Sequence, residues 1–242
     1  MSALLDVDNV SKSFRGLRAV HEASFEVAAG SITALIGPNG AGKTTCFNLI
    51  AGVLAPDAGA IRFDGQRIDG RRADQICVAG IGRTFQIVKP FLGLSVLENV
   101  MVGGLLRTRS ARQARAQARS ILERLELGPK AHTPAATLTL PERKRLEVAR
   151  ALATRPRLLL LDEVMAGLRP TECDQMVEVF RELNAGDGLT ILLIEHVMRA
   201  VMALAQHVVV LNFGQVIARG APEEIVRHPD VLGCYLGEDV EV

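Results

Sequence analysis

GPNGAGKTT, at residues 37–45, is the most informative stretch of this sequence. It places three glycines within six positions and follows them with a lysine and two threonines. Because glycine loses more backbone entropy on folding than other residues, such a cluster indicates a loop that needs bare backbone. The stretch lies between an apolar run, ITALI at 32–36, and a helical pattern at 44–54. In that strand-to-helix context, the match to G-x-x-x-x-G-K-T predicts a phosphate-binding loop.

The predicted loop gives each of its polar groups a role. Backbone N–H groups that point inward form a nest for an anion, supported by the positive end of the following helix. We expect Lys43 to reach the β- and γ-phosphates of a nucleotide and the Thr44 hydroxyl to bind Mg²⁺. The residues expected to contact the nucleotide here are Gly37, Pro38, Asn39, Gly40, Ala41, Gly42, Lys43, Thr44 and Thr45. The alternative is a glycine-rich turn that carries a lysine by chance.

A second apolar run supplies the carboxylate that such a metal needs. LLLLDE, at 158–163, has the pattern of a buried strand that ends in two acids. Ligands bind at the carboxyl ends of strands in open α/β sheets, so we expect Asp162 to hold Mg²⁺ there through water. We expect Glu163 to polarise the attacking water, as a general base or an orienting group. The alternative is a capping pair of acids at a strand end.

Two further side chains follow apolar runs in the same way. His196 follows TILLIE at 190–195, and we expect this strand beside the Asp162 strand, with His196 facing the γ-phosphate. Gln86 ends IGRTFQ, at 81–86, and is expected to contact the metal and the attacking water. A structural histidine at a strand end and a surface glutamine are the alternatives.

The composition narrows the class of protein. The chain has 242 residues, 48% of them hydrophobic and 4% aromatic, which allows one large domain or two small ones with an aliphatic core. A formal net charge of +1 disfavours nucleic-acid binding. No apolar run approaches the ~18 residues of a membrane helix, and aspartates near the start argue against a signal peptide. The four cysteines are scattered, which indicates reduced thiols rather than disulfides or a zinc site.

The order of apolar runs predicts an α/β fold with an open, mostly parallel sheet. A short strand pattern occurs at 32–36, and continuous runs, typical of strands buried on both faces, occur at 157–163, 190–196 and 207–214. Shorter strand patterns occur at 60–63 and 81–85, and helical patterns occupy most of 95–127 and 171–185. The segments 4–10, 20–27 and 60–63 alternate more strictly and suit an added antiparallel sheet.

Together these motifs resemble the ATP-binding subunit of an ABC transporter, along essentially the whole chain. GPNGAGKTT matches Walker A, Gln86 the Q-loop, LLLLDE the Walker B motif with its catalytic glutamate, and His196 the switch histidine. Phe14 lies where the family places an aromatic ring against adenine. The stretches RTFQ, LSVLENVMVG, AGLRPTE, LLIEHVMRAVM and GAPEEIVRHPDVLGCYLGED are similar to the branched-chain amino acid branch of bacterial importers.

The resemblance implies a fold and a set of partners. The fold would be a P-loop NTPase with a RecA-like core and antiparallel β-subdomain, about 1–86 and 151–242, and a helical subdomain, about 87–150. Two ATPase subunits would dimerise head to tail at the cytoplasmic face of the inner membrane, each gripping a permease subunit near residues 87–100. A periplasmic solute-binding protein would act indirectly, delivering branched-chain amino acids or a related small polar or aromatic solute. Nucleic acid is not an expected partner.

The signature motif departs from the family pattern L-S-G-G-Q. In its place stand Leu138, Thr139, Leu140, Pro141 and Glu142. In the family this segment binds the γ-phosphate held by the partner subunit, but Leu140 adds bulk, Pro141 lacks an N–H group and Glu142 brings negative charge. Pro141 suits a first helical turn, so the helix after it is expected to form. Arg169, in AGLRP, replaces the usual aspartate or asparagine.

These departures lead to a hypothesis about the dimer and leave alternatives for the function. Because each signature motif serves the nucleotide of the partner, we expect a heterodimer with one competent ATP site and one weak site. The leading function is ATP hydrolysis that drives import. A nucleotide-gated module that hydrolyses ATP slowly is the second. A soluble ABC ATPase acting on ribosomes or DNA is the third, although such chains usually carry two cassettes or a long coiled-coil insertion.

Overall fold

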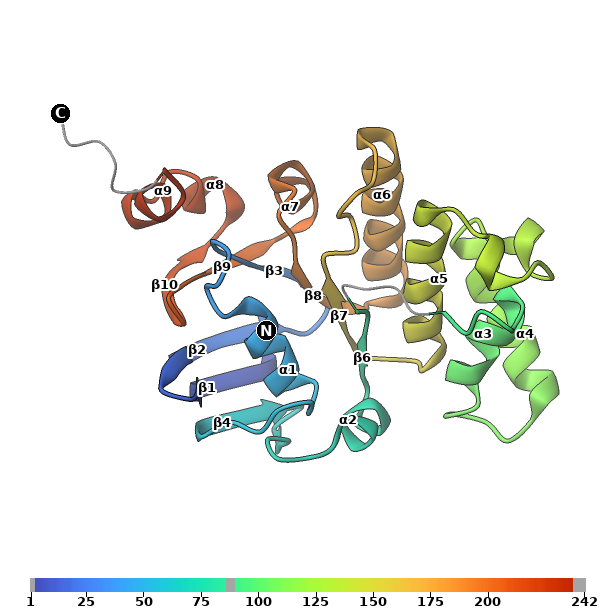
Figure 1. The fold of residues 1–242 in the computed structure, drawn as a ribbon, viewed down its shortest axis with the longest axis horizontal. Coiled ribbons are helices and arrows are strands. Elements are labelled where there is room, and N and C mark those ends of the chain that lie inside the picture. The colour runs from blue at the N-terminus through green and yellow to red at the C-terminus, as the bar shows by residue number, and fades with distance from the viewer. Residues whose placement is uncertain (1–2, 86–89, 237–242) are drawn as a thin grey trace.

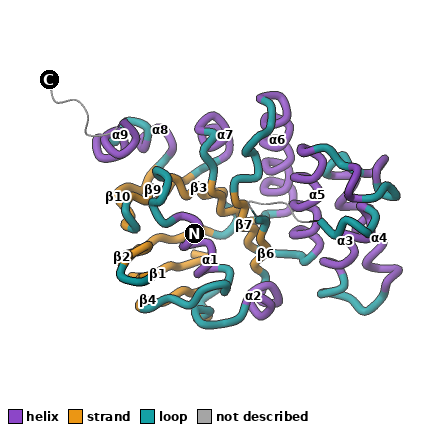
Figure 2. The backbone as a smooth tube through the Cα atoms, in the orientation of Figure 1, coloured by secondary structure: helices purple, strands orange, loops and turns teal. Residues whose placement is uncertain are grey.

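The structure is a computed structural model that describes residues 3–85 and 90–236. The fold contains two β-sheets. The larger one extends through the middle of the molecule with helices packed against it, and β1, β2 and β4 of the smaller one lie at the lower left in Figures 1 and 2. The predicted α/β class is therefore confirmed.

The larger sheet has six strands in the order β10-β9-β3-β8-β7-β6. They are β3 (Ile32–Ile36), β6 (Ile81–Arg83), β7 (Leu158–Asp162), β8 (Thr190–Ile194), β9 (His207–Asn212) and β10 (Gln215–Gly220). The strands from β6 to β9 are parallel, and β10 returns antiparallel to β9. The short strand predicted at 32–36 forms β3, and the three continuous apolar runs form β7, β8 and β9, as predicted.

The smaller sheet is antiparallel and has four strands in the order β2-β1-β4-β5. They are β1 (Ala3–Phe14), β2 (Leu17–Ala28), β4 (Ala58–Phe63) and β5 (Gln66–Arg67). This sheet contains the segments whose alternating pattern predicted it. β1 and β2 are longer than the pattern indicated, so the start of β2 reaches the phosphate loop. There Leu17 and Ala19 line a pocket together with residues of the loop.

The helices are α1 (Lys43–Ile50), α2 (Ala73–Ala79), α3 (Val96–Gly104), α4 (Ala111–Arg124), α5 (Leu140–Ala153), α6 (Pro170–Asp187), α7 (Met198–Leu204), α8 (Pro222–Ile225) and α9 (Pro229–Leu236). Helices α3, α4 and α5 pack together at one end of the molecule, to the right in Figure 1. Single 3₁₀ turns at 128–130 and 135–137 lead from α4 to α5. None of the helices among the described residues has the length and apolar character to cross a membrane.

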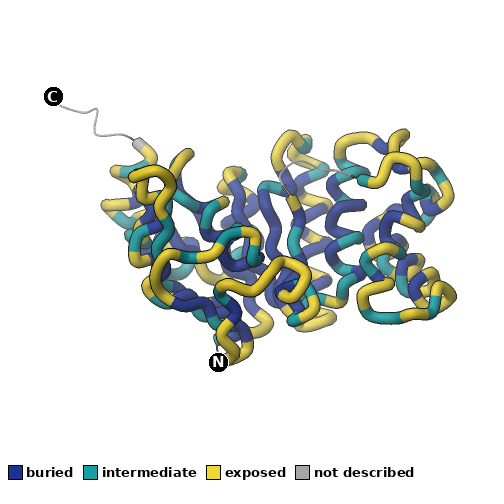
Figure 3. Tube along the Cα trace, turned by 60° about the horizontal axis from the view of Figure 1, so that its bottom comes forward, coloured by how far each residue is buried: buried dark blue, intermediate teal, exposed yellow. Residues whose placement is uncertain are grey.

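Two hydrophobic clusters explain why the central strands are apolar throughout. In β7, Leu159 and Leu161 enter a cluster shared with α5 and α6, whereas Leu158 and Leu160 enter a cluster shared with the smaller sheet and α1. Every residue of this strand is buried. Figure 3 shows the buried segments gathered in the interior of the molecule. Both faces of the sheet are therefore covered, and only the strand ends are open for polar groups.

Candidate functional site

The carboxyl ends of three neighbouring strands place the predicted polar groups at one edge of the larger sheet. β3 leads into residues 37–42, β7 ends at Asp162, and β8 is followed by Glu195 and His196. β7 pairs with β8 in parallel, with Asp162 opposite Ile194, as the sequence predicted for these two strands. Since parallel strands end at the same edge, the phosphate loop and the side chains of Asp162, Glu163 and His196 converge there.

The phosphate loop depends on glycine at two tightly packed positions. Gly37 and Gly42 have φ angles of 148° and 101°, which side chains disfavour. A Cβ atom at Gly37 would collide with the carbonyl oxygen of Leu211, and one at Gly42 with that of Ala19. The backbone of the loop is thus packed directly against β9 and the start of β2.

Lys43 lies inside the loop that precedes it. Its side chain is buried, and Nζ donates 2.8 Å hydrogen bonds to the carbonyl oxygens of Gly37 and Pro38. Burial lowers the pKa of Lys43, and the negative charges of Glu163 and Asp162 oppose this shift. The ammonium group is therefore fixed over the loop and faces the two carboxylates.

The open side of the loop is a pocket of about 250 Å³. The loop and the start of α1 line it through Gly40, Ala41, Gly42, Lys43, Thr44 and Thr45. Phe213 and the start of β2, at Leu17, Arg18 and Ala19, complete it. Thr44 is exposed there, as are Asn39 and Gly40 at the tip of the loop. Phe14 ends β1, pairs with Leu17 of this pocket and is 42% exposed, and Lys12 Nζ lies over its ring at 5.8 Å from the ring centre.

Asp162 forms an ion pair with Arg83, which the sequence argument did not identify. Its Oδ2 accepts a 3.0 Å hydrogen bond from Arg83, whose guanidinium also donates to Asn48 of α1 at 2.7 Å. Thr84 Oγ1 accepts from the Asp162 N–H group at 3.0 Å. Burial raises the pKa of Asp162, and Arg83 partly offsets this shift. Oδ1 is buried and has no hydrogen-bond partner among the described residues, so one oxygen remains for a further ligand.

Glu163 and His196 contact each other directly. Glu163 Oε1 lies 3.0 Å from His196 Nε2, and the two side chains are 15% and 42% exposed. The Glu163 backbone has a φ of 51°, in the left-handed region that is unfavourable for a residue with a Cβ atom. Its N–H group donates to the carbonyl of Ile194 at 2.9 Å, which ties the turn after β7 to the end of β8.

Gln86 lies outside the described residues, so its predicted role stays a prediction. The last described residue before it, Phe85, is held by the helix that follows the signature segment. Its N–H group donates to Glu147 Oε1 at 2.6 Å, and burial raises the pKa of Glu147.

The signature segment begins a well-formed helix, as predicted for Pro141 in a first turn. Thr139 is the N-cap of α5, and its N–H group donates to Glu142 Oε2 at 2.9 Å. Glu142 also pairs with Lys130 at 2.5 Å. Burial would raise the pKa of Glu142, but these two partners outweigh it and lower the pKa. The N-terminal end of α5 therefore carries the carboxylate of Glu142.

Arg169 has a local partner. It caps α6, and its guanidinium and N–H group all bond to Glu172 at distances of 2.7–2.9 Å. The Arg169 side chain is 82% exposed, so this ion pair is a surface feature.

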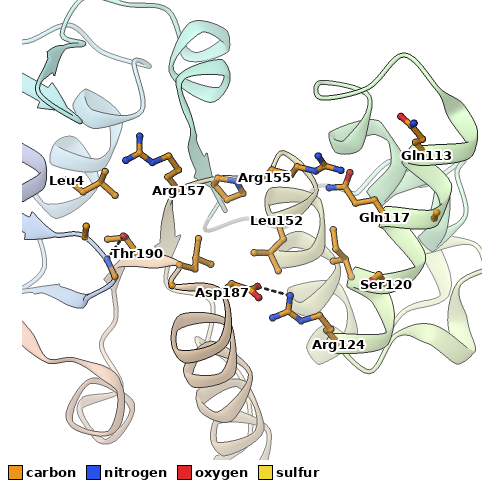
Figure 4. Close-up of a pocket in the computed structure, with 17 residues that line it drawn as sticks. Leu4, Gln113, Gln117, Ser120, Arg124, Leu152, Arg155, Arg157, Asp187 and Thr190 are labelled. Atoms are coloured by element: carbon orange, nitrogen blue, oxygen red, sulfur yellow. Dashed lines mark hydrogen bonds and ion pairs between the residues drawn. The ribbon is translucent and has the colours of Figure 1, made fainter.

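A separate groove of about 980 Å³ lies near the opposite, amino-terminal ends of the central strands. Its walls come from the segments before β3, β7 and β8 and from α4 (Figure 4). Arg124 of α4 and Asp187 at the end of α6 form a 2.7 Å ion pair across it. None of the described site residues lines this groove, so it is distinct from the phosphate loop.

Comparisons with known proteins agree on the family. The model of the ABC transporter family matches residues 20–166, and a model described as branched-chain amino acid ATP-binding cassette transporter matches residues 215–241. BraF of Pseudomonas aeruginosa, a high-affinity branched-chain amino acid transport ATP-binding protein, is 40% identical over 97% of this chain and 98% of its own. A nucleotide-free ATP-binding cassette from an ABC transporter is 31% identical, with a TM-score of 0.89 over 98% of this chain and 100% of that chain.

A dimeric bacterial ABC transporter cassette has a TM-score of 0.83 over 90% of this chain and 98% of that chain. It is 24% identical, so this likeness concerns the fold alone.

The fold and site define a P-loop nucleoside triphosphatase. The chain belongs to the ABC transporter family, as an ATP-binding and ATP-hydrolysing subunit of its branched-chain amino acid type. The resemblance stated from the motifs is therefore confirmed.

Two residues of this site escaped the sequence argument. Arg83 lies in the RTFQ stretch, which was used only as a mark of resemblance. Lys144 lies in the helix after the signature segment, where its Nζ donates to the carbonyl oxygen of Glu163 at 3.0 Å. A lysine or arginine inside an amphipathic helix usually faces solvent, so the pattern carried no sign that Lys144 is buried.

Proposed function

We propose that this chain powers an importer for branched-chain amino acids or a related small polar or aromatic solute. It would work at the cytoplasmic face of the inner membrane, held there by permease subunits that residues 87–100 contact. The observation that carries the ATPase assignment is the convergence of Lys43, Asp162, Glu163 and His196 at one sheet edge. The match of residues 215–241 and the likeness to BraF support the class of solute.

Mg²⁺ fits the oxygen donors of this edge. Thr44 offers an exposed hydroxyl, and Asp162 offers the buried Oδ1 that no described residue satisfies. Within the described ranges, no group of three or more His, Cys, Asp or Glu side chains could hold a metal. Because Mg²⁺ is often bound by one or two protein oxygens with phosphates and water, that scarcity suits a nucleotide-bound ion. We propose Gln86 as a further contact to this ion.

The remaining residues divide the work of phosphoryl transfer to water. The loop N–H groups and Lys43 would hold the phosphates, and Phe14 would stack on adenine. Glu163 would take a proton from the attacking water. The water oxygen would bond to the γ-phosphorus while the bond between that phosphorus and ADP breaks. His196 would hydrogen-bond the γ-phosphate and hold the Glu163 carboxylate, to which it is already bonded.

The signature segment supports a heterodimer with one competent site. In a head-to-tail dimer, the N-terminus of α5 would face the γ-phosphate bound to the partner subunit. Glu142 already occupies this helix end, and Pro141 offers no N–H group. We therefore propose that this chain's own Walker residues work with an intact signature motif from a different ATPase subunit. Residues 1–86 and 151–242 would form the nucleotide-binding core, and 87–150 the helical subdomain.

A slowly hydrolysing, nucleotide-gated module is the second candidate, favoured by the same carboxylate at the end of α5. The test uses the transporter complex purified through a tag on this chain, with Glu163→Gln as the control. ATP turnover that disappears in the variant and is stimulated by leucine, isoleucine or valine supports the importer motor. Nucleotide binding with equally slow release of phosphate from both proteins supports the gated module. Stimulation by another amino acid alone would reassign the solute.

A further inference from the structure

Lys144 connects the signature helix to the turn that carries the proposed catalytic carboxylate. It lies on α5, whose N-cap is Thr139, and it is 4% exposed. Its Nζ donates a 3.0 Å hydrogen bond to the carbonyl oxygen of Glu163, at the start of the turn after β7. The buried Lys144 side chain therefore joins α5 to Glu163. Helix α5 would contact the nucleotide of the partner subunit, and Glu163 would act on the nucleotide of this chain.

The bond falls on a backbone position that needs support. Glu163 has a φ of 51°, and such a conformation persists only where the surroundings hold it. Its N–H group is held by the carbonyl of Ile194 at 2.9 Å, and its carbonyl is held by Lys144. On the far side of the turn, Glu195 Oε1 accepts from the Met165 N–H group at 2.9 Å. Both ends of the Glu163 backbone are thus fixed, and its side chain is directed at His196.

The charge of Lys144 also matches its surroundings. Three buried carboxylates face it from three elements: Asp162 at the end of β7, Glu147 on α5 and Glu195 after β8. Burial raises the pKa of each, and the positive charge of Lys144 opposes that shift in all three cases. Replacing Lys144 with an apolar residue would therefore remove a hydrogen-bond donor and a positive charge that acts on all three acids.

We infer that Lys144 is a positioning residue, which holds Glu163 in its working conformation and transmits movement of the signature helix to it. The inference rests on the proposed role of Glu163 in hydrolysis. In the dimer, α5 would respond to the nucleotide held by the partner, while Glu163 acts on the nucleotide held by this chain. Lys144 is then a direct mechanical link between the two ATP sites.

The test compares Lys144→Met and Lys144→Arg with wild type in the transporter complex purified through this chain. Arg145→Met is the matched control, because Arg145 is the next residue of α5 and pairs with Glu126 and Gln175 instead. We expect Lys144→Met to lower kcat about tenfold or more, with the Kd for ATP within about twofold of wild type. Lys144→Arg, which keeps charge and donors, should recover part of kcat, and Arg145→Met should leave it unchanged.

A double-mutant cycle tests the link between the sites. Thr139→Ala weakens the signature helix at the partner's nucleotide, and we expect its effect on kcat to be smaller in the Lys144→Met background than in wild type. Effects that multiply independently would contradict transmission through Lys144.

Other outcomes overturn the positioning role itself. If Lys144→Met keeps the kcat of Arg145→Met, Lys144 does not position Glu163. If kcat and nucleotide affinity fall together with the melting temperature, the residue is merely structural. Failure of the proposed function looks different, because Glu163→Gln would then hydrolyse ATP as fast as wild type.

Discussion

His196 Nε2 lies 3.0 Å from Glu163 Oε1, although 33 positions separate the two residues in the sequence. Their strands, β8 and β7, are neighbours in the parallel sheet, and both side chains follow the carboxyl ends. The histidine is 42% exposed and the glutamate 15%, so the ring stands on the open side of the pair. A nucleotide entering from the phosphate loop would meet His196 and a carboxylate that it already orients.

Replacing His196 with alanine should therefore damage turnover more than binding. We expect kcat to fall about a hundredfold, because Glu163 loses its orienting partner and the γ-phosphate loses a hydrogen bond. The KM for ATP should stay within about twofold of wild type. His21→Ala is a suitable control, since that histidine lies on β2 and bonds to Arg18 and Gln215. Equal losses in the two variants would contradict a specific role for His196.

Arg83→Leu should destabilise the fold, because it leaves the Asp162 carboxylate buried without its cation. The two side chains are 10% and 2% exposed, and removing one partner of such a pair costs about 3 kcal/mol. Urea unfolding measures the effect. Adding Asp162→Asn should recover part of the loss. Arg62→Leu breaks half-exposed ion pairs with Asp6 and Asp8 and should cost less than about 1 kcal/mol. Similar losses in both arginine variants would contradict the argument.

Glu195 should make stability depend on pH. Burial raises its pKa to about 7 from an ordinary value of 4.5, so the folded state binds more protons than the unfolded state between these values. The contribution of this group to the free energy of unfolding therefore falls as the pH rises through that window. Glu195→Gln cannot ionise and keeps an acceptor for Met165. The difference in free energy of unfolding between the variant and wild type should therefore change in favour of the variant, by on the order of 3 kcal/mol, between about pH 4 and about pH 8.

Urea unfolding of Glu195→Gln and wild type across that pH range measures this gain. Glu223→Gln, which changes an exposed acid of α8, is the control and should track wild type. Parallel curves for Glu195→Gln and wild type would mean that the Glu195 carboxyl does not titrate in this window.

Restoring the signature pattern should make the isolated chain a better ATPase. The triple variant Leu140→Gly, Pro141→Gly and Glu142→Gln removes bulk, adds an N–H group and neutralises the carboxylate that occupies the end of α5. We expect turnover that rises with protein concentration and exceeds wild type about tenfold at saturation. Adding Glu163→Gln should abolish the gain. A triple variant no faster than wild type would remove the basis of the one-site heterodimer.

Phe14 should contribute to adenine binding without supporting the fold. The residue is 42% exposed, so Phe14→Ala should leave the melting temperature nearly unchanged. Loss of a stacking face should weaken ATP binding about fivefold to tenfold, measured by calorimetry, whereas Phe14→Tyr should bind as wild type does. Unchanged affinity in Phe14→Ala would leave Phe213, 86% exposed in the loop pocket, as the aromatic candidate.

Much of the site could be predicted from the sequence because local chemistry dictates it. The phosphate loop needs glycine where a Cβ atom would collide with β9 or β2. The nine consecutive residues at 37–45 meet this requirement in a pattern that can be read from the sequence. Apolar runs mark β7 and β8, and a parallel sheet sends every strand end to one edge. Asp162, Glu163 and His196 could therefore be placed together without coordinates.

Tertiary packing alone decided which groups hold these residues in place. Arg83 reaches Asp162 across 79 positions of sequence, and Lys144 reaches the Glu163 carbonyl because α5 packs against the turn after β7. Neither arginine nor lysine has a pattern that marks it as buried, since burial of a long charged side chain depends on partners supplied by other elements. The sequence by itself determined where the chemistry lies, and packing between distant elements determined how it is held.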